Sequence, residues 1–388
     1  MSQGSKRVLI IATVVKTHIM QFHIPTLKLF KDMGWETAVA ARNDYQNPED
    51  CQIPYCDRFY DIPFERVPFM PKNGECYKRL KDIIDRGSYQ IIHCHTPVGG
   101  VLGRLAARKT RKAGTRVLYT AHGFHFYRGA PLKNWLMYYP VEKLCAYYVD
   151  DIITINKEDY HFARSHFAPA KIHYLPGVGI DTMAFSPCAL SKEDRNAMRA
   201  ELGVQPGQRM ILSVGELIPR KNYKTAIDMM AKLHSEQLRY YICGQGVLRR
   251  EIEEYAKSQG VIERVVFLGY RRDIPQLCAC ADVFLHTSHQ EGLPVAVMEA
   301  MACGTPVVAS RIRGNVDLID DGVSGFLCAT QDAEDFAEKI RLVLEKPDLA
   351  QELRRNSLQK IQSFDMRIVM EQLQNIYGEK SVMECITP

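Results

Sequence analysis

Short runs of Val, Ile and Leu alternate with helical patterns along most of this chain, in two successive series. A short continuous apolar run between helices is typical of a parallel strand buried on both faces. Each series therefore predicts a doubly wound α/β domain. In the first series we expect strands at residues 7–15, 37–41, 91–95, 116–121 and 151–155, and helices at 21–33, 101–112 and 133–148, the last interrupted near Pro140.

Residues 174–187 interrupt this alternation, because four Pro and Gly residues leave no clear period there. We interpret the stretch as a linker between a domain over residues 1–178 and a domain over 179–365, followed by a tail over 366–388. The two domains are expected to face each other across a cleft, with ligands at the carboxyl ends of the strands. The second series predicts strands at 210–214, 239–243, 265–268, 283–286, 306–309 and 325–327, and helices at 332–345 and 349–364.

The composition is that of a globular protein, with 46% hydrophobic and 24% charged residues among 388. Its longest apolar run, Val8–Val15, is far shorter than the ~20 residues of a membrane span. Lys6 and Arg7 precede this run as in a signal peptide, but no small-residue cleavage site follows. The 12 cysteines are scattered, and Cys278 and Cys280 are too close for a zinc or redox motif. A cytoplasmic protein without disulfides is expected.

Charge is unevenly distributed between the two halves. Residues 1–178 carry 25 Lys and Arg against 16 Asp and Glu, a net charge of +9, whereas the rest carries −4. Arg104, Arg108 and Arg111 recur at helical spacing, and residues 123–150 are rich in aromatic and basic side chains. This pattern favours peripheral contact with an anionic membrane at the inner face of the cell membrane, although a solvated basic face would look similar. No nucleic-acid-binding module is recognisable.

Two loops after predicted strands carry groups suited to anions. Arg220 and Lys221 follow Gly215 just before a helix, and adjacent Arg and Lys suit a diphosphate, although a solvated helix start remains an alternative. Gly244 and Gly246 form half of a dinucleotide fingerprint, but the third glycine is missing and a tight turn explains them better.

The loop and helix over residues 289–304 hold two acids. Glu291 lies before the helix, while Glu299 lies among Val, Met and Ala and should need a hydrogen-bonding partner, for which a structural ion pair is one possibility. Pro294 fits the first helical position. The N–H groups around Gly292, Leu293 and the next residues could bind an anion.

Together these loops resemble the retaining glycosyltransferases of family 4, which have the GT-B fold. Glu291 and Glu299 form an E-x7-E spacing, and the following residues 300–310 match the family pattern. The segments 120–131 and 154–159 are most similar to bacterial capsular and exopolysaccharide glycosyltransferases. The resemblance runs from Val8 to about Tyr377.

The resemblance implies a nucleotide-sugar donor, UDP-linked, and a saccharide acceptor, polyprenyl-diphosphate-linked. Arg220 and Lys221 would hold the donor diphosphate, Glu299 the ribose hydroxyls, and Glu291 the transferred sugar. Residues 268–273, with Tyr270 and Arg271, would line the nucleobase. The tail after residue 364 would return to the first domain.

His122 would face the transferred sugar from across the cleft. Retaining enzymes of this fold generally show no well-placed nucleophile, so the acceptor would attack on the face from which the diphosphate leaves. A zinc site at His122 and His125 would need further ligands, which the spacing does not supply. No D-x-D pair is present, so neither a metal nor another cofactor is expected.

One segment departs from the family pattern. The loop after the first strand lacks the Gly-Gly pair of many relatives, and His18 or Lys16 would supply side-chain contacts instead. This loop also argues against an NAD-dependent oxidoreductase, which needs a glycine fingerprint there. A GT-B sugar-nucleotide epimerase and a nucleotide-sugar sensor without transferase activity remain as alternatives.

Overall fold

The computed structural model describes residues 5–65, 70–168 and 170–378, which form two α/β units. One unit comprises the described residues up to Val178 together with those from Val369 onward, and the other comprises Gly179–Ile368. Among the described residues, no helix is both long and apolar enough to cross a bilayer. The described cysteines are all free thiols.

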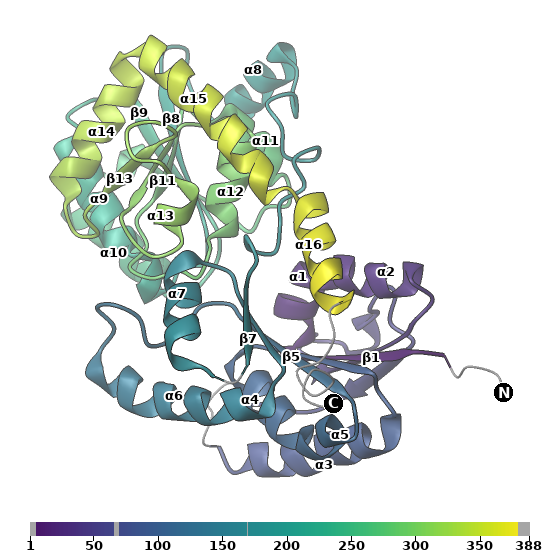
Figure 1. The fold of residues 1–388 in the computed structure, drawn as a ribbon. Helices are drawn as coiled ribbons and strands as arrows, with labels where there is room; N and C mark the ends of the chain where they lie inside the picture. Colours follow the sequence, from purple (N-terminus) through teal and green to yellow (C-terminus); the bar gives the residue numbers. More distant parts are fainter. Residues whose placement is uncertain (1–4, 66–69, 169, 379–388) are drawn as a thin grey trace. The chain divides into compact units, whose positions relative to one another are not determined.

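The first unit is built on a parallel sheet of seven strands in the order β3-β2-β1-β4-β5-β6-β7. Figure 1 labels β1, β5 and β7 of this sheet. The strands are β1 (Arg7–Val14), β2 (Glu36–Arg42), β3 (Arg58–Asp61), β4 (Ile91–His95), β5 (Arg116–Ala121), β6 (Asp151–Thr154) and β7 (Lys171–Tyr174). Its helices are α1 (Met20–Phe22), α2 (Ile24–Asp32), α3 (Lys72–Gly87), α4 (Pro97–Ala106), α5 (Arg108–Lys112), α6 (Leu132–Cys145), α7 (Lys157–His166) and most of α16 (Met366–Gly378).

Both faces of this sheet are covered, as the continuous apolar runs predict. Along β1, Leu9 and Ile11 pack toward α3 and α4, whereas Val8 and Ile10 pack toward α2 and α16. Helix α16 comes from the end of the described chain and contributes to the second of these cores, with Val369, Leu373, Ile376 and Tyr377.

The second unit has a parallel sheet of six strands in the order β10-β9-β8-β11-β12-β13. The strands are β8 (Arg209–Val214), β9 (Leu238–Cys243), β10 (Val265–Gly269), β11 (Val283–His286), β12 (Val307–Ser310) and β13 (Phe326–Cys328). Its helices are α8 (Lys192–Glu201), α9 (Tyr223–Lys232), α10 (Arg249–Ser258), α11 (Ile274–Cys280), α12 (Val295–Ala302), α13 (Asn315–Leu318), α14 (Ala333–Glu345) and α15 (Pro347–Ile361). Helices α9, α10 and α14 cover one face, and α11 and α12 contact the strands from the other.

Several sequence-based boundaries need correction. Strands β3 and β7 were not predicted, because both are short edge strands with partly exposed residues and no continuous apolar run. The helix expected over residues 101–112 is divided into α4 and α5. The helix expected over 21–33 is likewise divided, into α1 and α2, and a π-helical turn at Val15–Ile19 precedes it. Strands β4, β5 and β11 have the predicted bounds.

Candidate functional site: a charged cluster in the second unit and a histidine cluster in the first

Three loops of the second unit meet at the carboxyl ends of β8, β11 and β12, where the strand order reverses between β8 and β11. The loop after β8 carries Arg220 and Lys221 in a 3₁₀ turn, and the loop after β11 carries Glu291. Arg220 Nη1 lies 2.7 Å from Glu291 Oε2, and Lys221 Nζ lies 2.7 Å from Oε1. The fold thus brings the two cations predicted for a diphosphate onto the acid predicted for the sugar.

Asn222 fixes these two loops to each other. Its backbone adopts the left-handed conformation (φ 54°), which Asn tolerates better than most residues. Its side-chain amide donates to the carbonyls of Thr287 (3.1 Å) and Thr330 (2.9 Å). The Thr287 hydroxyl donates back to the carbonyls of Lys221 and Asn222. Arg220 and Lys221 are therefore held on an ordered turn.

Glu291 is a buried anion. The Ser288 hydroxyl donates to Oε1 at 2.9 Å, and His286 Nε2 lies 3.5 Å from the same atom. Asn315 Nδ2 lies 3.3 Å from His286 Nδ1 and can donate to it, which places the ring proton on Nε2, toward Glu291. Burial alone would raise the pKa of Glu291, but His286, Lys221 and Arg220 outweigh it and hold that pKa well below its usual value. The carboxylate is therefore charged at neutral pH.

The loop after β12 supports the amino end of α12. Arg313 Nε donates to the carbonyl of Glu291 at 3.2 Å. A Cβ on Gly314 would lie 2.4 Å from the carbonyl oxygen of Gly292, so only glycine allows this approach. Helix α12 begins at Val295 with Pro294 as its N-cap residue, one position later than the sequence predicted. Pro294 makes no side-chain cap hydrogen bond, and the N–H groups of Val297 and Met298 donate to its carbonyl at 3.2 and 3.3 Å, so the N–H groups at the very start of the helix lack a side-chain cap.

Glu299 contradicts the expectation of a partner within the protein. Among the described residues, its carboxyl group makes no side-chain hydrogen bond and no ion pair. Burial raises its pKa to about 7, although part of the side chain remains accessible to solvent. An ionisable group in this state is available to a ligand.

The glycines of the second unit have mainly a packing role. A Cβ on Gly244 would lie 1.9 Å from the carbonyl oxygen of Gly215, and Gly215 N donates to the carbonyl of Cys243 at 2.9 Å. These residues let the loops after β8 and β9 run side by side, which supports the tight-turn interpretation. In the loop after β10, Tyr270 is 67% exposed and Arg271 is paired with Asp273.

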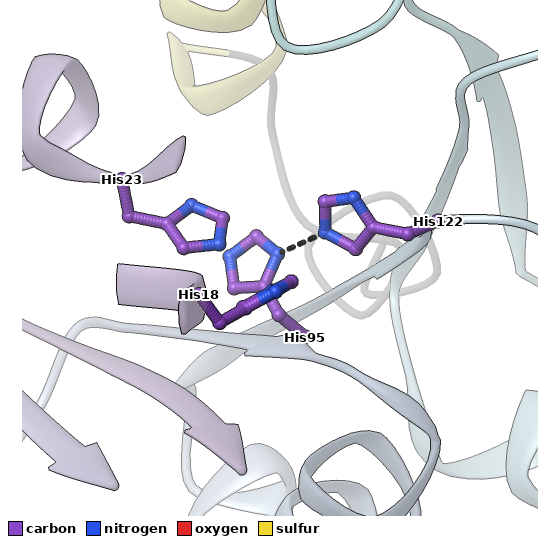
Figure 2. Close-up of side chains that lie close together, drawn as sticks. All are labelled: His18, His23, His95 and His122. Carbon is purple, nitrogen blue, oxygen red and sulfur yellow. Dashed lines mark hydrogen bonds between the residues drawn. The ribbon is translucent and has the colours of Figure 1, made fainter. Parts of the chain in front are cut away.

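In the first unit, the fold surrounds His122 with three more histidines. His18, His23, His95 and His122 each offer a ring nitrogen, and these nitrogens lie within 4.8 Å of one another (Figure 2). His95 Nδ1 is 3.3 Å from His122 Nε2. The expectation that His122 lacks neighbouring ligands is therefore wrong, because its neighbours come from the ends of other strands.

His125 and Lys16, which were named as candidates from the sequence, are not part of the histidine cluster. His125 stacks on Tyr138, with ring centroids 4.5 Å apart, and is not one of the four grouped residues. Lys16 extends its ammonium group over the ring of Tyr45. Burial lowers the pKa of His122 to about 4, so its imidazole is neutral at pH 7.

The predicted basic face of residues 101–112 does not exist as a free surface. Arg104 is fully buried, donates from Nη2 to Glu142 Oε2 at 2.7 Å and stacks on Tyr119. Arg111 pairs with Asp150 at 3.0 Å. Of the three arginines, only Arg108 is exposed, and it lies over the ring of Tyr148. The spacing of the arginines in the sequence does not indicate the break between α4 and α5. Nor does it indicate the buried acids Glu142 and Asp150, which pair with Arg104 and Arg111.

Comparisons with known proteins agree with this architecture. The family model described as glycosyl transferases group 1 matches residues 194–360, and that described as glycosyl transferase 4-like matches residues 7–156. The chain is 40% identical over 380 residues to EpsD of Bacillus subtilis, assigned as a glycosyltransferase, covering 96% of this chain and 97% of that protein.

A second relative has a more specific name. It is the Escherichia coli UDP-Gal:alpha-D-GlcNAc-diphosphoundecaprenol alpha-1,3-galactosyltransferase, which is 30% identical over 70% of this chain and 72% of its own. Among solved structures, HepE of Anabaena in complex with UDP and glucose superposes with a TM-score of 0.80 at 22% identity, over 96% of this chain and 99% of that one. The chain belongs to the GT-B glycosyltransferases of group 1 with a family-4-like first domain.

Proposed function

We propose that this glycosyltransferase moves a sugar from a UDP-sugar to a lipid-linked saccharide, with retention of configuration, during surface polysaccharide biosynthesis. The observation that carries the proposal is the group formed by Arg220, Lys221 and Glu291 beside the uncapped end of α12. Two ordered cations and free N–H groups at a helix start suit a diphosphate. The named substrates of the Escherichia coli relative, UDP-Gal and a diphosphoundecaprenol-linked sugar, support this donor and acceptor.

The leaving diphosphate would be stabilised by side chains. Glu291 holds Arg220 and Lys221 in position without donor, so little reorganisation is needed when charge develops on the diphosphate. Glu299 has no side-chain hydrogen bond or ion pair within the described part of the chain and could accept hydrogen bonds from ribose hydroxyls. His122, being neutral, would serve as a hydrogen-bonding group for the sugar and not as a nucleophile. Retention is supported by the alpha linkage in that relative's name, since an α-linked donor gives an α product only if configuration is kept.

Metal independence at the donor can be tested with Mg²⁺. Because Arg220 and Lys221 supply the positive charge, we expect turnover after brief EDTA treatment to be unchanged by added Mg²⁺. Loss of turnover in EDTA that Mg²⁺ restores would contradict this part of the proposal. Mg²⁺ is the ion to add because it prefers oxygen ligands. Its effect on turnover therefore reports a metal bound at the donor diphosphate and not one bound by histidines.

The donor site itself is tested by thermal shift against UDP, GDP, ADP, CMP, NAD and UDP-sugars. UDP should raise the melting temperature by mass action. The shift should be lost in Arg220→Ala and Glu299→Ala but kept in Arg250→Ala, a matched control whose side chain is exposed on α10. Stabilisation by NAD alone would overturn the proposal. UDP release on adding a polyprenyl-diphosphate saccharide would separate a transferase from a sensor.

Peripheral membrane contact is proposed for α6 in place of the arginines named above. Leu132 and Leu136 are 72% and 70% exposed, and Lys133 and Lys143 lie on the same helix. Exposed leucines with lysines suit the interface of an anionic bilayer. Co-sedimentation with phosphatidylglycerol vesicles should be lost when both leucines become Asp, but kept in Val247→Asp, a similarly exposed apolar residue of the second unit. No binding of the unmodified protein at low salt would contradict this.

A further inference from the structure

The four histidines around His122 converge from the carboxyl ends of three adjacent strands. His18 and His23 follow β1, His95 is the last residue of β4, and His122 directly follows β5. Figure 2 shows the four rings pointing toward one another from these separate segments. The strand order reverses between β1 and β4, and doubly wound sheets bind ligands at such a position.

The distances are close to those of a tetrahedral metal site. Zn–N bonds of about 2.0–2.1 Å in a tetrahedral arrangement place ligand nitrogens about 3.3 Å apart. His95 Nδ1 and His122 Nε2 already have this separation, 3.3 Å. One ring nitrogen from each of the four histidines lies within 4.8 Å of the others, so no pair exceeds the tetrahedral separation by more than about 1.5 Å.

Two of the rings hold unsatisfied nitrogens deep in the protein. His23 and His95 are each 3% exposed. Nε2 of each has no hydrogen-bond partner among the described residues, and in His95 this is the ring nitrogen other than the Nδ1 that lies 3.3 Å from His122 Nε2. Buried polar atoms are rarely left unpaired.

His93 shows what a structural histidine looks like in the same place. Its Nδ1 is bonded to the hydroxyl of Tyr377 at 2.7 Å and its Nε2 to that of Thr120 at 2.8 Å. It packs on His95, with ring centroids 4.1 Å apart, but has no nitrogen left for a ligand. Its neighbours His23 and His95 differ in this respect.

The backbone after β1 is also unusual. Residues Val15–Ile19 form a π-helical turn, a rare conformation that is frequent at functional sites. The widened turn leads into α1 so that His18 and His23, five residues apart, approach with ring centroids 4.9 Å apart. This turn occupies the loop whose lack of glycine departs from the family pattern.

We propose that His18, His23, His95 and His122 together bind one divalent transition-metal ion, of which zinc is the best fit. Four imidazoles suit zinc in preference to Mg²⁺ or Ca²⁺. Four protein ligands close the coordination shell, so the ion has a structural role and holds the loop after β1 to the ends of β4 and β5. His122 binds through one nitrogen and keeps the other for hydrogen bonding.

The test is zinc binding by the full chain, purified without a polyhistidine tag, stripped of metal and dialysed against Zn²⁺ or Co²⁺. We expect one equivalent of zinc by mass spectrometry and a tetrahedral visible spectrum with Co²⁺. His18→Ala and His95→Ala should each weaken zinc binding at least about 100-fold. His166→Asn, a histidine of α7 outside the cluster, is the matched control and should bind normally.

His18 is partly exposed, so its substitution should leave the fold intact, which circular dichroism checks. The proposal is overturned if the unmodified protein binds no stoichiometric zinc, or if folded His18→Ala and His95→Ala bind it as tightly as the control. Neither readout depends on sugar transfer, so failure here leaves the proposed function untouched, and failure of UDP binding leaves the metal proposal untouched.

Discussion

Two glutamates eight positions apart occupy opposite electrostatic environments. Glu291 is surrounded by Arg220, Lys221 and His286, which lower its pKa, whereas burial without a partner raises the pKa of Glu299 to about 7. Their stability contributions therefore depend on pH with opposite sign. The paired carboxylate contributes stability when it is ionised, whereas ionisation of the buried Glu299 carboxyl group lowers stability.

The pH dependence of Glu299→Gln tests this difference. Between about pH 4.5, the ordinary Glu pKa, and pH 7 the folded protein holds a proton that the unfolded chain releases, so stability falls as pH rises. Glu299→Gln has no carboxyl group to ionise, so the variant does not lose stability in this way. We expect it to match the unmodified protein at pH 5 and to be more stable at pH 8, by on the order of 1–3 kcal/mol after allowing for partial exposure. Calorimetry at both pH values measures this.

Glu291→Gln provides the opposite case. The pKa of Glu291 is lowered in the folded protein. The stability that its ionised carboxylate contributes is therefore fully present above about pH 4.5 and is lost as the pH falls through the pKa of Glu291 in the folded state. The Gln variant should be less stable than the unmodified protein at neutral pH and should approach it in acid. Parallel pH curves for the two variants would contradict these assignments.

At the scale of elements, α4 and α6 are joined by a buried ion pair. Arg104 and Glu142 are 0% and 8% exposed in their side chains, and Tyr119 lies against both. Such a pair contributes little net stability, but removal of one partner leaves an isolated buried charge. Arg104 is therefore not available for the membrane contact that was predicted from the sequence.

Arg104→Ala should therefore lower the free energy of unfolding of the first unit by about 3–5 kcal/mol. Arg108→Ala, one turn away and exposed, should change it by less than about 0.5 kcal/mol. Both tryptophans, Trp35 and Trp135, lie in this unit, so tryptophan fluorescence during denaturation reports on it. Equal effects of the two substitutions would contradict the buried pair.

At the scale of the whole molecule, the end of the described chain completes the core begun by the first strand. Helix α16 places Leu373 and Tyr377 in the same core as Val8 and Ile10. Arg116 also donates to the carbonyl of Tyr377 at 3.0 Å. Stability of the first unit thus depends on residues more than 350 positions downstream of β1.

Leu373→Ala should cost the first unit about 2–5 kcal/mol, because it leaves a cavity in this core. Gln374→Ala, the next residue and exposed, is the matched control. A lower denaturation midpoint by tryptophan fluorescence for Leu373→Ala alone is expected. A midpoint equal to that of the control would show that α16 is not part of the first unit's core.

The inner strands of both parallel sheets could be predicted from the sequence, because strands buried on both faces need continuous apolar runs, as at β4, β5 and β11, whereas the edge strands β3 and β7 could not. The sequence also located the loops with Arg220, Lys221, Glu291 and Glu299, since their chemistry follows strand ends. Local patterns could not reveal Asn222, His286 and Arg313, or the pairing of Arg104, which depend on contacts between distant segments. The histidine cluster is the clearest such case: His18, His95 and His122 become neighbours only because β1, β4 and β5 are adjacent in the sheet.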